Sequence, residues 1–114
     1  MRFTFHLSPS SGWLADGSID WFWTAAERAQ PPLMVNVPGQ TAKIASIAQR
    51  HPRLRFILDH MARPRGLKDD AAFADLDDLL SLARHPNVAV KTSSIPCYST
   101  EAYPFRNLDR KSVV

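Results

Sequence analysis

The chain has 114 residues, 45% of them hydrophobic and 22% charged, which is the composition of one globular domain rather than of a disordered segment. Its 14 Lys and Arg outnumber 11 Asp and Glu, but they are scattered along the sequence, so we expect no nucleic-acid partner. The single cysteine, Cys97, cannot form an internal disulfide and has no evident activating partner. No apolar stretch approaches the roughly 20 residues that span a bilayer. We therefore predict a cytoplasmic protein without a membrane partner.

The first third of the chain predicts a strand, a helix and a second strand. Residues 2–6 are rich in β-forming side chains and end at the turn-forming residues 8–12. Residues 18–29 carry apolar side chains at helical spacing, with Ser18 as the expected N-cap. Residues 33–37 form a short apolar run, typical of a strand buried on both faces of a parallel sheet.

The rest of the chain repeats this alternation. Residues 41–50 predict a helix capped by Thr41, and residues 54–58 predict a strand. Residues 69–84 predict the clearest helix, and residues 87–91 predict the last strand. The apolar stripe expected on the long helix comprises Phe73, Leu76, Leu80 and Ala83.

The predicted order is β-α-β-α-β-α-β, which favours an α/β fold with parallel strands and right-handed crossovers. Two architectures have this order: a small doubly wound sheet, or a part of a (β/α)₈ barrel, which normally needs about 250 residues. The length favours the first. The second is favoured because the chain starts inside a strand and has no helix to cover the last one. A partial (β/α)₈ barrel would expose two sheet edges, so we also predict self-association.

Polar residues lie at the carboxyl ends of all four predicted strands, where parallel sheets form their sites. They are His6, Asn36, the pair Asp59-His60, and Lys91. His60 is the sharpest catalytic candidate, because an imidazole titrates near neutral pH and can also bind metal. Lys91 is the second, because an ammonium can stabilise a developing oxyanion. The alternative is that strand ends are polar simply because the chain leaves the core there.

Further candidates lie in the loops at the same end. Arg63 and Arg65 follow His60 and could bind a substrate carboxylate, although charged loop residues are more often merely solvated. Tyr98 belongs to an aromatic group that could wall a ring-shaped substrate or simply pack in the core. We expect His6, Asn36, Arg63 and Tyr98 to be the substrate-binding residues of the site.

Two motifs resemble those of the amidohydrolase-related family of barrel hydrolases. They are RFILDHMARP at residues 55–64 and PNVAVKTSS at residues 86–94. That family shows a strand ending in Asp-His with a nearby Pro, followed by an Asn-Val-x-x-Lys-x-Ser strand. Residues 1–107 then correspond to a partial barrel domain covering strands four to seven, and residues 108–114 to a tail outside the family pattern.

The resemblance implies a site at the mouth of the barrel, often with zinc or another divalent metal, and a small-molecule substrate. It implies that His60 and Lys91 are catalytic, and that His60 is a metal ligand if the intact barrel is metal-dependent. Asn36 stands where metal-dependent members have a histidine, which favours the metal-independent, lactonase-like branch, in which water attacks a carbonyl. A fragment of this size would hold at most half the site and be inactive alone. The alternatives are a decarboxylase of the same family or a non-catalytic ligand- or protein-binding domain.

Overall fold

The computed structural model describes residues 1–111 and contains one four-stranded parallel sheet. Its strands are β1 (Arg2–Thr4), β2 (Leu33–Asn36), β3 (Phe56–Leu58) and β4 (Val88–Val90), and they lie side by side in chain order. Each strand is parallel to its neighbour, and one row of paired residues runs Arg2, Met34, Ile57, Ala89 across the sheet. The predicted alternation of parallel strands and connecting helices is confirmed, and it is the arrangement of a partial (β/α)₈ barrel.

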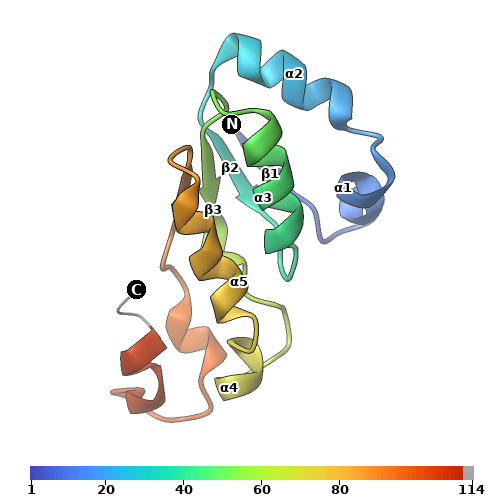
Figure 1. The fold of residues 1–114 in the computed structure, drawn as a ribbon. Helices are drawn as coiled ribbons and strands as arrows, with labels where there is room; N and C mark the ends of the chain where they lie inside the picture. Colours follow the sequence, from blue (N-terminus) through green and yellow to red (C-terminus); the bar gives the residue numbers. More distant parts are fainter. Residues whose placement is uncertain (112–114) are drawn as a thin grey trace.

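The helices connect consecutive strands. They are α1 (Trp13–Asp16), α2 (Asp20–Ala29), α3 (Thr41–Arg50), α4 (Asp69–Ala72) and α5 (Leu76–Ser81). Short 3-10 segments cover Ser10–Gly12, Asp59–Ala62, Leu82–Arg84, Ile95–Tyr98 and Arg106–Lys111. Figure 1 shows α3 and α5 on the same face of the sheet, with α2 at one end of the molecule and α4 near the other.

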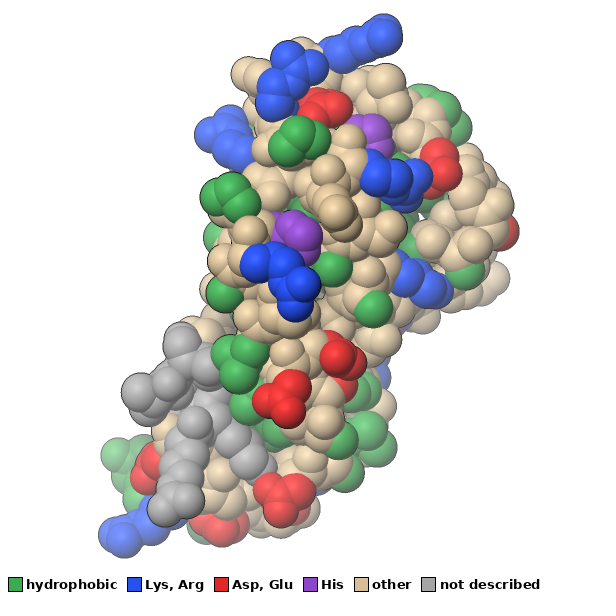
Figure 2. Space-filling model, viewed as in Figure 1, with side chains coloured by type: hydrophobic (Ala, Val, Ile, Leu, Met, Phe, Trp, Pro, Cys, Tyr) green, Lys and Arg blue, Asp and Glu red, His purple; other side chains and the backbone are tan. Residues whose placement is uncertain are grey.

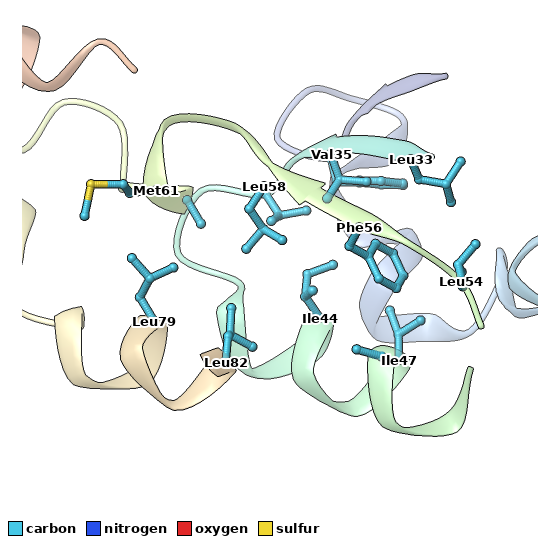
Figure 3. Close-up of a cluster of buried hydrophobic side chains, with 14 of the residues drawn as sticks. Leu33, Val35, Ile44, Ile47, Leu54, Phe56, Leu58, Met61, Leu79 and Leu82 are labelled. Atoms are coloured by element: carbon cyan, nitrogen blue, oxygen red, sulfur yellow. The ribbon is translucent and has the colours of Figure 1, made fainter. Parts of the chain in front are cut away.

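The core lies between the sheet and the helices α3 and α5. Side chains alternate along a strand, so Phe56 and Leu58 point to one face and Ile57 to the other. Phe56 and Leu58 are buried against the helices, whereas Ile57 is only half-buried. Figure 3 shows these strand side chains meeting Ile44 of α3 and Leu82, which follows α5. Burial of each such side chain contributes about 2 kcal/mol, so this covered face accounts for most of the stability of the fold.

The long helix predicted over residues 69–84 is broken, and its predicted stripe is partly wrong. Leu80 is exposed, whereas Leu79 and Leu82 are buried. The break follows from Arg63, whose Nη1 donates to the carbonyl oxygen of Ala72. That oxygen is therefore taken by a side chain, and the next helical turn starts again from Leu76 with a different face towards the core.

Both predicted helix caps are also wrong. Ser18 does not cap α2, because its amide and hydroxyl both donate to the Asp16 carboxylate, and α2 begins two residues later at Asp20. Thr41 is the first residue of α3, so Gln40 occupies the N-cap position. In both cases the helix begins without a side-chain cap, and packing of its apolar face against the sheet compensates for the missing hydrogen bond.

Asn87, which precedes β4, contacts the end of α3 and the loop before β3 at the amino-terminal end of the sheet. Its side-chain amide donates to the carbonyl oxygens of Ala48, His51 and Leu54, at 3.2, 3.1 and 2.9 Å. These three carbonyls belong to the end of α3 and the loop that leads into β3. One side chain therefore bonds to backbone carbonyls at the end of α3 and in the loop after it.

Two features of the described residues concern contacts with membranes and nucleic acids. None of the helices within residues 1–111 has the length and apolar character needed to cross a bilayer. On the face shown in Figure 2, Lys and Arg side chains lie in separate groups among neutral and acidic ones rather than in one continuous band.

Candidate functional site

The turn Asp59–Ala62 follows β3 and has an unusual backbone. His60, Met61 and Ala62 have φ values of 53°, 54° and 53°, in the left-handed region that costs an L-residue about 1 kcal/mol. Hydrogen bonds on both sides hold it there: Met61 N donates to Lys91 O at 2.9 Å, and Gly39 N donates to Ala62 O at 2.9 Å. The turn therefore interrupts the strand alternation and gives Asp59 and His60 different surroundings.

Asp59 faces the open side of the sheet, where it lies between two cations. Its carboxylate is fully buried and accepts a hydrogen bond from Lys91 Nζ at 3.0 Å. Its other oxygen lies 3.1 Å from Arg2 Nε, an ion-pair distance without hydrogen-bond geometry. Lys91, predicted to be catalytic, is thus neutralised by Asp59, and its side chain does not line the hollow that contains His60. Its catalytic role stays a prediction.

His60 lines an open hollow of about 300 Å³ at the carboxyl ends of the strands. Its Nδ1 lies 2.9 Å from Ser93 Oγ, which comes from the loop after β4. The hollow collects residues from the loops after β2, β3 and β4. Its lining consists of Asn36, Pro38, His60, Arg63, Arg65, Ser94 and Tyr98.

Arg63 is a buried cation, although the sequence suggested a loop charge. Its Nε donates to Met61 O at 3.0 Å, and its Nη1 donates to Ala72 O at 3.0 Å and forms an ion pair with Asp75. Its guanidinium also lies over the Phe73 ring, 5.5 Å from the centroid. Nη2 is buried and has no partner among the described residues. Arg63 therefore supports the turn after β3, and the two N–H bonds of its buried Nη2 have no partner among the described residues.

His6 is held against the second arginine. Arg65 Nη1 donates to His6 Nε2 at 2.6 Å, which joins the loop after β1 to the loop after β3. Burial, and secondarily the positive charge of Arg65, lowers the pKa of His6. His6 is thus kept neutral as an acceptor for the exposed Arg65 guanidinium. The structure places it behind Arg65 rather than in the lining of the hollow.

Asn36 and Tyr98 complete the wall of the hollow, as predicted for substrate-binding residues, but their binding role stays a prediction. Burial raises the pKa of the Tyr98 hydroxyl, so this group is a neutral hydrogen-bonding partner at physiological pH. Sequence reasoning missed Ser93 and Ser94. Ser93 stands in the Lys-x-Ser motif, but its contact with His60 depends on the left-handed turn, which no sequence pattern indicated.

A divalent metal does not fit the described residues alone. Residues 1–111 contain no group of three or more His, Cys, Asp or Glu side chains placed to bind an ion. His60 is bonded to a serine, His6 Nε2 accepts from a guanidinium, and the Asp59 carboxylate is already shared by two cations. A metal would have to displace these partners from Asp59 and from His6 Nε2, whereas His60 Nε2 is open among the described residues but provides only a single ligand.

The comparisons with known proteins identify the family. No curated protein and no solved structure matches the chain. The family model described as amidohydrolase matches residues 2–111, which is nearly the whole chain. Its four parallel strands and connecting helices have the arrangement of part of a (β/α)₈ barrel. The chain belongs to the amidohydrolase family.

Proposed function

We propose that the hollow around His60 is part of a hydrolytic site for a small carboxylated or lactone substrate, which water attacks at the carbonyl carbon. One observation carries the proposal: an imidazole and two guanidinium groups, His60, Arg63 and Arg65, line one hollow at the carboxyl ends of parallel strands. A general base and two anion-binding groups are what ester or lactone hydrolysis needs.

In this reaction His60 accepts a proton from water as the oxygen attacks the carbonyl carbon. The carbonyl π electrons move to its oxygen, and the resulting oxyanion is stabilised by the arginine N–H groups. When the tetrahedral intermediate collapses, the ring C–O bond breaks and His60 returns the proton to the leaving alkoxide. The product of a lactone is a hydroxy acid, whose carboxylate also suits Arg65. No step is assigned to a metal or to Lys91.

A binding experiment tests the site with the 114-residue chain itself. Benzoate and benzenesulfonate carry the same charge on the same ring, but the sulfonate is tetrahedral, like the intermediate of hydrolysis. A hydrolytic site is complementary to that geometry, so we expect benzenesulfonate to bind several-fold more tightly in NMR titrations, with shifts centred on His60 and Arg65. Arg65→Met should abolish both shifts. Equal binding of the two anions would instead support a non-catalytic ligand-binding domain, and shifts elsewhere would contradict the site.

Turnover is a separate measurement. We expect the 114-residue chain alone to bind without hydrolysing, because the described residues surround only one side of a substrate. A pH-stat assay with δ-valerolactone would check this, using His60→Asn because asparagine tolerates a left-handed backbone better than alanine. His85→Ala is the matched control, since His85 lies at the opposite end of β4. Hydrolysis that is lost in His60→Asn and kept in His85→Ala would contradict the inactivity but support the role of His60.

A further inference from the structure

The contact between His60 and Ser93 is fixed by the backbone around it. Lys91 N donates to Leu58 O at 2.8 Å, and Met61 N donates to Lys91 O at 2.9 Å. These two bonds clamp the turn after β3 against the end of β4, on either side of His60. The side-chain bond from His60 Nδ1 to Ser93 Oγ, at 2.9 Å, therefore joins two segments that are already held together.

Such a bond selects one form of the ring. A neutral imidazole carries its proton on one nitrogen and a lone pair on the other, whereas a serine hydroxyl can either donate or accept. Among the described residues, Ser93 Oγ has no other hydrogen-bonding partner and His60 Nε2 has none. The direction of the bond is therefore tied to the tautomer: if Ser93 accepts, the proton of His60 is on Nδ1, and if Ser93 donates, the proton is on Nε2.

The rest of the hollow decides the direction of this bond. Its two arginines can only donate hydrogen bonds, and one of them, Arg63, has a buried N–H group without a partner. A positive, donor-rich hollow favours a lone pair on the imidazole nitrogen that faces ligands over another N–H group. The proton is then on Nδ1 and is donated to Ser93.

We propose that Ser93 is a positioning residue that holds His60 as the Nδ1–H tautomer and leaves the Nε2 lone pair to accept a proton. Only the use of the Nε2 lone pair as a general base rests on the proposed hydrolytic function; the choice of tautomer does not. Ser93 itself does not touch the reacting atoms. Its role is like that of the groups that bind the second ring nitrogen of a catalytic or metal-binding histidine and so fix the tautomer and orientation of the ring.

The tautomer can be read without any substrate. The chain is 12.8 kDa and has four histidines, so two-bond ¹H–¹⁵N spectra at pH 9 should resolve each ring. We expect His60 to show protonated Nδ1 and unprotonated Nε2 in the wild type. Ser93→Val should move His60 towards the Nε2–H form. Ser93→Thr, which introduces a side chain of nearly the same shape as valine but keeps the hydroxyl, should retain the wild-type pattern.

Controls separate this effect from general disturbance of the fold. Ser94→Ala removes the neighbouring hydroxyl, which has no bond to His60, and should leave the tautomer unchanged. The ring of His51, bonded to Glu27 at the other end of the sheet, serves as the internal reference in every variant. If Ser93→Val does not fold, Ser93→Cys, with its weaker acceptor, provides the same comparison.

The results of these experiments support or overturn the proposed role of Ser93 as follows. An Nε2–H form in the wild type, or no difference between Ser93→Val and Ser93→Thr, overturns the proposal. The expected tautomers together with preferential binding of benzenesulfonate support it as part of the hydrolytic site. The expected tautomers without any anion binding at His60 support the Ser93–His60 pairing while overturning the proposed function.

Discussion

The two faces of the sheet differ in what they do. The face towards α3 and α5 is closed, and strand residues such as Phe56 and Leu58 are buried there. On the opposite face Ile57 is half-buried, Ala89 is exposed, and charged groups gather at Asp59. The comparison shows that one face supplies the stability of the fold, whereas the other is the side that a closed barrel would turn inward.

Neighbouring residues of β3 give the sharpest test of this difference. Leu58→Ala should lower the free energy of unfolding by about 3 kcal/mol, because it leaves a cavity in the closed core. Ile57→Ala, on the open face, should cost only about 1 kcal/mol. Urea titrations followed by circular dichroism measure both. Equal losses would show that the open face is covered in solution, for example by a second molecule.

Asn87 tests how the closed face is fastened at its edge. Asn87→Ala removes the donor shared by the carbonyls of Ala48, His51 and Leu54, and we expect a loss of about 1–2 kcal/mol. Asn87→Asp keeps the shape but brings a negative charge to the same carbonyls, so it should be the more damaging change. If aspartate were tolerated better than alanine, the three hydrogen bonds would not be the reason for asparagine at this position.

The free edge of the sheet at β4 should also lead to association of the chain. Strand β4 has one free edge among the described residues, and an apolar hollow of about 310 Å³ beside it is lined in part by Leu80 and Val90. We expect the chain to self-associate in sedimentation velocity experiments as its concentration rises. Val90→Lys should weaken the association several-fold, whereas Thr24→Lys, which adds the same charge to α2, should not. A monomer at all concentrations would contradict this prediction.

The smallest expected effect is on acid stability at the amino-terminal end of the sheet. The backbone N–H of Arg53, and secondarily the His51 ring, lowers the pKa of Glu27 below its ordinary value of 4.5. Glu27 therefore contributes stability that is present above pH 4.5 and is lost as the pH falls through its folded pKa. Thermal melts between pH 3 and 6 should show a shallower acid limb for Glu27→Gln, which keeps an acceptor for Arg53. An unchanged slope would show that Glu27 is not coupled to folding.

Much of this fold could be predicted because apolar runs and helical spacing reflect burial directly. Four strands, their parallel order and the polar residues at their carboxyl ends followed from that pattern alone. The break after α4 could not be predicted, because it depends on Arg63 reaching the Ala72 carbonyl from a distant loop. The candidate site could be predicted only in part: His60 follows a strand, but its pairing with Ser93 and the contact of Lys91 with Asp59 are tertiary contacts.

The left-handed turn at residues 60–62 also has a consequence for evolution and design. Glycine adopts such a backbone without the cost that an L-residue has, so glycine at 62 would relax the turn, whereas glycine at 61 would also remove the buried Met61 side chain from the core. His60, Met61 and Ala62 lower the stability of the fold slightly, but their restricted main chain holds the His60 ring in one position. Directed evolution for thermal tolerance should therefore accept glycine at residue 62 more readily than at residue 61.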